Sequence, residues 1–566
     1  MIQSLQWKFE MKDQASQPMQ SNVSYSGRWV ARVHGKIVAQ GGTPEQALRA
    51  SQQSRYKEEP EIIYMPVAFP LPPLIEKIKV CLPSDQRIHL VGGAVRDVLL
   101  GRLSQDFDFA LPANGISIAR KVANTLKADF VPLDDKRDTG RVIVTDENGS
   151  RTFLDFATYR GASLEEDLEA RDFTINALAY DLQTDSMIDP LDGAKDLQGK
   201  TIRACSQKSL SDDPLRILRA VRQAAAFGFH IEKETRELMK QAAGQLGNVS
   251  VERLRDELFK IFEGPTPDAS IHALEMLDVF PYLLPELVPM KGVEQPSPHV
   301  YDVWMHTLAV LASLEEIISA LLDRDSEEAN DAFTVLLLKR LGQYRGKFAA
   351  HFAESLNADR SYRSLLFFAA LYHDVSKPET KTIDENGRIR FFDHEIKGAD
   401  VAAERAQLMN LSNDEINRAH TIIKNHMRIH FHAARLENEK QTPSRRAIYR
   451  FFRDSSQAGI DLVLLALADL RGMYGSTLTP DIWNAYLDIS SILLENYWER
   501  PEQIVFPPRL LDGHELMKEL NLQPGPIVGQ LLEAVRENQA AGKIENREQA
   551  IAFAREAFAK GTTGEL

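Results

Sequence analysis

Hydrophobic and polar positions follow two different patterns along the chain, and the change falls near residue 207. Between about residues 75 and 200, short alternating runs such as RIHLV, FDFAL, RVIVT and RTFLDFAT are mixed with helical patterns. From 207 onward, nearly every segment has the spacing of an amphipathic helix. The pattern therefore predicts an α+β protein in which an α/β head precedes a long helical body.

The first 70 residues form a separate section. After a polar start, GRWVARVHGKIVAQGG alternates apolar and polar residues around a turn at His34 and Gly35, and TPEQALRASQQS has helical spacing. PEIIYMPVAFPLPPLI fits a last strand that runs into a proline-rich linker. We predict a small β-hairpin and helix unit over residues 1–70, which extends an RNA surface, forms a homodimer, or only stabilises the fold.

Proline-containing turns divide the helical body. They precede PSPHVYDVW (296–304) and PRLLDGHELMKELNLQPGPIVGQLL (508–532). The predicted domains are a head over 71–206, a helical neck over 207–290, a helical body over 291–480, and a helical tail over 481–566 that binds RNA.

Composition excludes several protein classes. The 566 residues contain two cysteines, so a disulfide framework and a cysteine-built zinc site are excluded, and a reducing, cytosolic location is predicted. The longest apolar runs fall short of about 20 residues, which predicts no membrane span. The net charge of −14 argues against a uniformly basic nucleic-acid coat, but it allows a local basic groove for RNA.

The segment DFDFAL carries candidate metal ligands. Asp106 and Asp108 lie two apart on a predicted strand, so both carboxylates leave the same face. Two neighbouring anions need a cation, and carboxylate oxygens suit Mg²⁺ with a substrate triphosphate. Upstream, Gly92 and Gly93 lie between a strand and a helix, where backbone amides can hold a triphosphate that Arg96 also reaches. The alternative is an ordinary hairpin with solvent-facing aspartates.

These motifs indicate a family. LVGGAVRDVLLGRLSQDFDF resembles the signature of class II nucleotidyltransferases of the polymerase β superfamily, which includes tRNA CCA-adding enzymes and bacterial poly(A) polymerases. The resemblance implies a polymerase-β-like head. ARDFTINALAYD resembles the family's ribose-recognising motif, which implies that Arg171, Asp172 and Asn176 line the sugar and triphosphate. Ala170 replaces an arginine of that motif.

Three later segments extend the resemblance. DDPLRILRAVRQAAAFGF (212–229) resembles the base-selecting motif, with Asp212 in place of glutamate and Gln223 in place of phenylalanine. VSVERLRDELFKIF (249–262) resembles the neck motif, and residues 510–550 resemble the tail of the CCA-adding group.

The base-selecting motif also has a physical interpretation. Asp213 and Arg216 are predicted to lie three apart on a helix, so they share a face and present an acceptor beside a donor. Cytosine and adenine offer the complementary pattern, whereas uracil and guanine offer the opposite one. The alternative is a surface ion pair. Arg219 and Arg222 continue the spacing and either hold phosphates or only solvate the helix.

Two further head residues are candidates. Asp155, in FLDFATYR, is either a third acidic residue that activates the primer hydroxyl or a hydrogen-bonded structural residue. Arg141 is predicted in a turn-rich loop that closes over the nucleotide, a role that Arg137 would also fit.

The helical body carries histidines and aspartates within apolar runs. Their order, H…HD…D, resembles HD-domain metal-dependent phosphohydrolases, which implies His306, His373, Asp374 and Asp469 as metal ligands. His394 and His426 fall where fuller HD sites carry further histidines, for a second metal or a phosphate. Imidazole with carboxylate suits a transition metal such as Mn, Ni, Fe or Zn. The implied activity is hydrolysis of phosphomonoesters or 2′,3′-cyclic phosphates.

PSRRAIYRFFRD (443–454) is a candidate RNA contact because basic and aromatic residues alternate in it. The alternative is a helix with a solvated arginine face and an aromatic core face. The predicted RNA-binding residues are Arg445, Arg446, Arg450 and Arg453. A helix that begins near Gly525 could meet a further phosphate.

The sequence therefore predicts an enzyme that adds CCA to tRNA 3′ ends from CTP and ATP with Mg²⁺, and that has a fused HD phosphohydrolase. The alternatives within the class are a poly(A) polymerase, a CC-adding enzyme and an A-adding enzyme. The alternative of another class is an HD hydrolase whose head only binds RNA.

Overall fold

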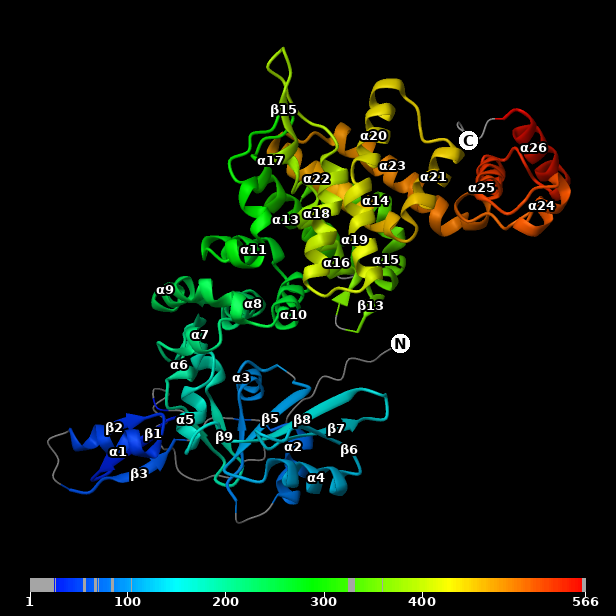
Figure 1. Cartoon of the computed structure of the whole chain (residues 1–566). Helices are drawn as coiled ribbons and strands as arrows, with labels where there is room; N and C mark the ends of the chain where they lie inside the picture. The colour runs from blue at the N-terminus through cyan, green and yellow to red at the C-terminus, as the bar shows by residue number, and fades with distance from the viewer. Residues whose placement is uncertain are drawn as a thin grey trace. The chain divides into compact units, whose positions relative to one another are not determined.

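The computed structural model describes residues 25, 27–53, 58–65, 69, 71–82, 86–102, 104–323, 331–358 and 360–561. The polar start of the predicted extension, residues 1–24, lies outside the described residues. The chain divides into two compact units, residues 1–209 and 210–566 (Figure 1). The first unit contains the large sheet and the second is almost entirely helical, so the predicted α+β class is confirmed. The finer boundaries at 70, 290 and 480 stay predictions.

The N-terminal hairpin and helix form as the alternation predicts. Strands β1 (Trp29–Val33), β2 (Lys36–Gly41) and β3 (Glu61–Tyr64) make an antiparallel sheet in the order β2-β1-β3, and α1 (Pro44–Gln52) follows β2. The turn at His34 and Gly35 has φ values of 49° and 76°, which the short hairpin loop requires. Thr43 caps α1 by accepting a hydrogen bond of 3.1 Å from the Gln46 amide.

The head is a seven-stranded sheet in the order β10-β9-β4-β5-β8-β7-β6. Its strands are β4 (His89–Val91), β5 (Asp106–Leu111), β6 (Asp129–Asp134), β7 (Thr139–Thr145), β8 (Arg151–Thr158), β9 (Ala179–Asp181) and β10 (Ser186–Ile188). Strands β5 and β8 are parallel, and the other neighbouring pairs are antiparallel. Apolar residues of β5 and β8 share one core with α2 (Pro73–Cys81) and α4 (Gly115–Leu126), so these helices cover one face.

Shorter elements complete this part of the chain. They are α3 (Gly93–Leu99), α5 (Leu164–Glu169), the 3-10 helix η2 (Thr174–Asn176), α6 (Gly193–Gln198) and β11 (Thr201–Ile202).

A buried polar network ties β4, β8 and β9 together. His89 Nε2 lies 3.6 Å from an Asp181 oxygen, and its Nδ1 lies 3.1 Å from the Tyr159 hydroxyl. The other Asp181 oxygen accepts the amides of Gln183 (2.8 Å) and Thr184 (3.1 Å). Burial alone would raise the pKa of Asp181, but His89 and these two amides lower it to about 2.

The Asp181→Asn variant is therefore expected to lose about 2 kcal/mol of folding free energy at pH 6. Because the folded-state pKa is lowered, this contribution is present above pH 3.8 and disappears as the pH falls through about 2. The check is hydrogen exchange of the β9 and β10 amides between pH 6 and pH 3, with the exposed Asp129→Asn as control. If the difference in exchange rate between wild type and variant is as large at pH 3 as at pH 6, the lowered pKa of Asp181 is not the source of this stability.

The second unit is helical from the neck to the tail. Its helices are α7 (Ser209–Asp212), α8 (Arg216–Phe227), α9 (Lys233–Ala242), α10 (Val251–Phe262), α11 (Pro267–Met276), α12 (Phe280–Leu283), α13 (Val303–Leu322), α14 (Ala332–Leu341), α15 (Arg345–Phe352), α16 (Tyr362–Tyr372), α17 (Lys377–Thr380), α18 (His394–Leu408), α19 (Asn413–Asn425), α20 (Met427–Glu439), α21 (Arg445–Ser455), α22 (Ala458–Tyr474), α23 (Pro480–Glu499), α24 (Gly513–Leu520), α25 (Pro526–Ala540) and α26 (Arg547–Ala559). Two small hairpins, β13 (Ser355–Asn357) with β14 (Arg360–Ser361) and β15 (Lys381–Ile383) with β16 (Ile389–Phe391), interrupt this series.

Helix α13 is longer and more apolar than the sequence patterns indicated. By length and composition alone it could cross a membrane, although half of its most apolar stretch is buried inside the protein. It packs against α22 and α16 and carries the buried His306. A core helix of a folded body therefore accounts for its composition.

Candidate active sites

The face of the head sheet opposite α2 and α4 carries three carboxylates. On β5, Asp106 and Asp108 are exposed while Phe107 and Phe109 are buried, as the alternation predicts. In the parallel pair of β5 and β8, Asp155 lies directly opposite Asp108. The sheet therefore brings Asp155 to the face that holds the two predicted metal ligands.

These carboxylates influence one another. Loss of surrounding water raises the pKa of Asp108, although the side chain keeps an exposed surface; the charges of Asp155 and Asp106 raise it further, while Arg171 lowers it. Crowded anions of this kind fit a divalent cation, because the cation removes their repulsion. The chemistry of the carboxylate set thus suits Mg²⁺.

Arg141 lies on β7, directly opposite Asp155, and not in a loop as predicted. Its Nε donates to Asp155 Oδ1 and its Nη2 donates to Asp155 Oδ2, each at 2.8 Å. The loop prediction is wrong because the strand begins at Thr139, immediately after the turn-rich segment. Arg137 lies within that turn with its side chain largely exposed.

The predicted phosphate turn has the required shape. Gly92 caps α3 with φ of 76°. A Cβ on Gly92 would lie 2.7 Å from Arg171 Nη1 and 3.4 Å from Asp108 Oδ2. Only glycine therefore fits between the arginine and the carboxylate.

The other predicted nucleotide-binding residues of the head form one network. Arg96 Nη1 donates to Asn176 Oδ1 (2.6 Å), and Asn176 Nδ2 donates to Asp172 Oδ1 (2.9 Å). Asp172 and Asn176 are buried, and Arg171 pairs with Asp167 at 3.0 Å. The motif residues therefore support one another beside Gly92. Gly93, also predicted to bind nucleotide, is the first residue of α3.

The prediction that Asp213 and Arg216 share a helix is wrong. Helix α8 begins at Arg216, and Asp213 lies in the turn before it, where its carbonyl accepts the Arg216 amide at 3.0 Å. The reason is Pro214, which disfavours helical backbone at the preceding residue. Asp213 Oδ2 instead accepts a 2.7 Å hydrogen bond from Arg253 of α10, a partner that the sequence did not indicate.

Arg219 and Arg222 both approach a buried glutamate. Arg222 Nε donates to Glu257 Oε2 at 2.7 Å, and Arg219 Nη1 lies 3.8 Å from Glu257 Oε1. Glu257 belongs to the segment that resembles the neck motif and is 4% exposed. Glu257 therefore neutralises part of the positive charge of Arg219 and Arg222. Neither of the two predictions for these arginines included this partner.

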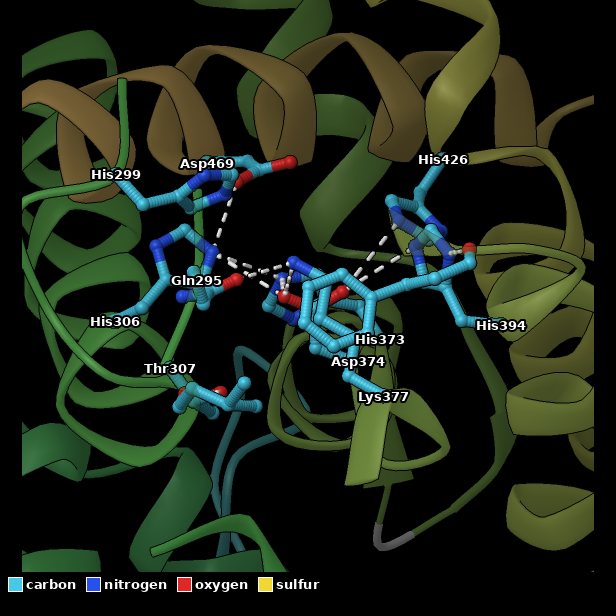
Figure 2. A network of polar contacts seen from close by, with 12 residues as sticks. Gln295, His299, His306, Thr307, His373, Asp374, Lys377, His394, His426 and Asp469 are labelled. Atoms are coloured by element: carbon cyan, nitrogen blue, oxygen red, sulfur yellow. Dashed lines mark hydrogen bonds and ion pairs between the residues drawn. The ribbon is translucent and has the colours of Figure 1, made fainter. Parts of the chain in front are cut away.

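The histidines and aspartates of the body converge in the core (Figure 2). Two groups each place their candidate ligand atoms within 4.8 Å of one another: His306 with His373 and Asp469, and Asp374 with His394 and His426. Figure 2 shows Asp374 between the two groups, and its Oδ2 lies 3.4 Å from His306 Nε2 while its Oδ1 lies 3.5 Å from His394 Nε2. Five helices or helix ends therefore supply the candidate ligands of one centre, which consists of two adjacent groups.

The histidine rings are oriented for metal binding. His373, His394 and His426 each place Nδ1 within 2.7–2.8 Å of a backbone carbonyl, which leaves Nε2 directed into the centre. Burial and neighbouring histidines lower the pKa of His426 to about 3, so its ring is neutral. Asp374 Oδ1 and His394 Nε2 are buried without a hydrogen-bond partner among the described residues. Buried oxygen and imidazole nitrogen atoms without a hydrogen-bond partner are suited to bind transition metals.

Comparison with known proteins identifies both domains that carry the candidate sites. Family models match in order: "Poly A polymerase head domain" at residues 88–203, "Probable RNA and SrmB-binding site of polymerase A" at 228–290, "HD domain" at 346–469, and "tRNA nucleotidyltransferase domain 2 putative" at 509–554.

Full-length relatives decide the family. An A-adding tRNA nucleotidyltransferase of Deinococcus radiodurans is 31% identical over 83% of this chain and 95% of its own length. A CC-adding tRNA nucleotidyltransferase of Thermus thermophilus is also 31% identical, over 83% and 95% of the two chains. The chain belongs to the tRNA nucleotidyltransferase family. It is accordingly an enzyme with nucleotidyltransferase activity, as the sequence motifs predicted.

Solved structures agree with the fold. A CCA-adding enzyme in complex with CTP matches with a TM-score of 0.56 at 22% identity, over 87% of this chain and 97% of the other.

The sequence missed a lysine in the HD centre of this nucleotidyltransferase. Lys377 is buried, and its Nζ lies 2.6 Å from Asp374 Oδ2 and donates to Gln295 Oε1 at 2.7 Å. Burial alone would raise the pKa of Asp374, but His373 and Lys377 hold it well below its usual range. The available signal was the spacing in HDVSK, where the lysine follows the aspartate by one helical turn.

His430 of α20 was also missed. Its Nε2 lies 2.8 Å from Asp469 Oδ2, and its Nδ1 contacts the Tyr486 hydroxyl at 2.8 Å. The ring thus holds the Asp469 carboxylate from the side opposite His306, whose Nε2 is 3.1 Å from the other oxygen. A residue in this position orients a metal ligand without binding the metal.

The His430→Ala variant is expected to bind the metal nearest Asp469 about 10- to 100-fold more weakly, because Asp469 loses the group that orients it. Metal affinity measured by competition with a chelator checks this, and His420→Ala on the surface of α19 is the matched control. An unchanged affinity would show that Asp469 needs no such support.

The arginines predicted to bind RNA are engaged within the protein. Arg450 makes a bidentate pair with the buried Glu537 of α25, through contacts of 2.8 and 2.6 Å. Arg446 Nε lies 3.0 Å from the same carboxylate, and Arg453 Nη1 lies 3.3 Å from Glu533. Arg445 donates to a backbone carbonyl at 3.3 Å. These pairs join α21 to the tail, and RNA binding by the four arginines stays a prediction.

The aromatic residues of the same segment belong to the core. Phe451 and Phe452 are fully buried, and Tyr449 is buried with its hydroxyl donating to Glu533 at 3.0 Å. The alternative in which α21 has an aromatic core face is confirmed. Base stacking by these rings is excluded, because no face of Phe451 or Phe452 is available.

Proposed function

We propose that this enzyme adds the CCA sequence to tRNA 3′ ends, using CTP and ATP with Mg²⁺. The observation that carries the proposal is the set of carboxylates on one face of the sheet, where Asp108 lies beside Gly92 and Arg171 and Asp106 lies two residues before it on the same strand. Membership of the tRNA nucleotidyltransferase family supports the tRNA substrate.

Each residue of the head has a role in this reaction. Asp106 and Asp108 would hold Mg²⁺, which supplies neutralisation of the triphosphate and a more acidic primer hydroxyl. Arg171 lies beside the carboxylates and adds a fixed positive charge for the phosphates. The network of Arg96, Asn176 and Asp172 presents buried polar groups that orient the sugar. The 3′ hydroxyl then attacks the α-phosphate and pyrophosphate leaves.

Asp155 and Arg141 form a support for this site. Since Arg141 takes both oxygens of Asp155, the pair holds the third carboxylate at a constant distance from Asp108. In our proposal Asp155 accepts the proton of the primer hydroxyl, and Arg141 orients it.

Base selection is assigned to the turn before α8. Asp213 accepts and Arg216 donates, which complements cytosine and adenine but not uracil or guanine. Arg253, which donates to Asp213, restrains the carboxylate. Arg219 and Arg222 remain candidates for the triphosphate, anchored by Glu257.

A second candidate function is partial addition, because the two full-length relatives named above are an A-adding and a CC-adding enzyme. One experiment separates the possibilities. Purified enzyme is incubated with tRNA lacking its 3′ end, with labelled CTP and ATP separately and together. Three added residues followed by arrest would support CCA addition. Addition of only two C residues, or of one A to a tRNA that ends in CC, would contradict CCA addition and indicate partial addition. A long ladder of A residues would indicate a poly(A) polymerase.

We further propose that the HD centre hydrolyses phosphomonoesters or 2′,3′-cyclic phosphates with two transition-metal ions, such as Mn, Ni, Fe or Zn. The shared position of Asp374 between the two ligand groups favours a pair of ions. Lys377 and Gln295 would bind a phosphate oxygen at this centre. Phosphate release from 2′,3′-cyclic ends of tRNA tests this activity independently of nucleotide addition. A homodimer and a cytosolic location stay predictions.

A further inference from the structure

The described residues between 27 and 65, here called the N-terminal module, lie outside every matched family, since the first match begins at residue 88. The module is nevertheless attached to the head. It binds residues 187–192, here called the docking loop, which run from β10 to the start of α6.

The attachment is a close contact between backbones. The Asp189 amide donates to the Gly42 carbonyl at 2.8 Å, and the indole of Trp29 donates to the Met187 carbonyl at 3.0 Å. A Cβ on Gly42 would lie 1.4 Å from the Asp189 carbonyl oxygen. No side chain fits at Gly42 while the module is docked.

Polar side chains complete the contact. Gln46 Nε2 donates to the Pro190 carbonyl at 2.7 Å. Arg28 Nη1 donates to Asp192 at 2.6 Å and lies 3.7 Å from Asp189. The module therefore restrains four of the six positions of the docking loop.

The docking loop in turn sets the position of α6. Asp189 is 1% exposed, and its carboxylate accepts the amides of Gly193 (2.7 Å) and Ala194 (3.1 Å) at the start of that helix. A Cβ on Gly193 would lie 2.1 Å from the Thr174 carbonyl oxygen. Helix α6 thus lies directly against η2.

Helix α6 also binds η2 through side chains. Asp196 Oδ2 accepts the Thr174 hydroxyl at 2.7 Å. Thr174 begins the short helix that ends at Asn176, and Asn176 contacts both Arg96 and Asp172. A continuous series of buried contacts therefore connects the N-terminal module to the sugar-orienting network.

We infer that the N-terminal module positions the nucleotide's sugar by holding the docking loop, α6 and η2 in place. Its residues act through other groups and are positioning residues. The inference rests on the proposed role of Arg96, Asp172 and Asn176 in nucleotide binding. This role differs from the three predicted ones, which were an extended RNA surface, a homodimer contact and stabilisation of the fold alone.

The test is the full-length Gly42→Ala variant, which removes the space that docking needs. Rapid hydrogen exchange at the Asp189 amide reports that the module has undocked. We expect the KM for CTP to rise about tenfold with kcat within about twofold, and the preference for CTP over 2′-deoxy-CTP to fall about fivefold. The control is Lys36→Ala, an exposed residue of β2, which should leave all three quantities unchanged.

If Gly42→Ala does not fold, Arg28→Ala combined with Gln46→Ala removes the side-chain contacts and keeps the test available. Undocking that leaves KM and the sugar preference unchanged would overturn the inference, even if thermal stability falls. A wild-type enzyme that adds no nucleotide to tRNA would instead contradict the proposed function, and this outcome is seen before any variant is measured.

Discussion

Replacing Asp106 and Asp108 together with asparagine is expected to slow nucleotide addition by at least about a thousandfold. The change removes two negative charges from the exposed face of β5 but keeps the side-chain shapes, and Phe107 and Phe109 still anchor the strand in the core. The triphosphate would then lose the ions that neutralise it. Single-turnover extension of tRNA with saturating CTP measures the effect.

The matched control for this pair is Asp129→Asn. Asp129 lies exposed on β6, at the edge of the same sheet and away from β5 in the strand order. It should extend tRNA at the wild-type rate. A double variant that extends RNA at normal speed, with its fold intact by circular dichroism, would remove the basis of the proposed transferase site.

Replacing Asp374 with asparagine is expected to abolish metal binding at both HD groups and to lower phosphate release by more than about a hundredfold. The carboxylate is buried between the two groups, so both lose a charged oxygen when it becomes an amide. Metal content after dialysis, measured by elemental mass spectrometry, and hydrolysis of a 2′,3′-cyclic nucleotide check this. Nucleotide addition should stay within about twofold of wild type.

Two comparisons sharpen that experiment. His426→Ala affects only the group of Asp374, His394 and His426, so it should retain about one equivalent of metal on the other group. Asp400→Asn, whose side chain is 68% exposed on α18, should retain both. Equal metal content in the Asp374 and Asp400 variants would contradict a shared ligand, and loss of nucleotide addition in Asp374→Asn would contradict independent sites.

Local patterns predicted the parts of each site that lie on one element. Alternation in DFDFAL placed Asp106 and Asp108 on the exposed face because a strand turns successive side chains to opposite sides. Gly92 of LVGGAV marked the turn because glycine takes a positive φ without strain. The histidines and aspartates of the body stood out because ionisable groups are rare in apolar helices.

Local reasoning failed where a neighbouring residue changed the backbone. The spacing of Asp213 and Arg216 indicated a shared helix, but Pro214 ends helical geometry before it. Arg141 was assigned to a loop because the preceding residues favour turns, whereas the strand starts at Thr139. In both cases the sequence predicted the wrong secondary structure for the residue.

The sequence did not indicate which charged residues of distant segments form ion pairs. Arg253 donates to Asp213, and Arg222 donates to Glu257. Glu537 pairs with three of the arginines that were interpreted as RNA contacts. A carboxylate on a helix has many possible partners in the sequence, and only packing brings one of them within hydrogen-bond distance.

The sequence by itself determined the fold class, the family motifs and the residue types of both candidate sites, because these depend on periodicity and on short segments. Only the tertiary structure decided that Asp155 lies opposite Asp108, that Asp374 stands between two ligand groups, and that the N-terminal module is attached to α6 through Asp189. The reason is that strand register and helix packing are set by the burial of the whole core, which no short segment of the chain specifies.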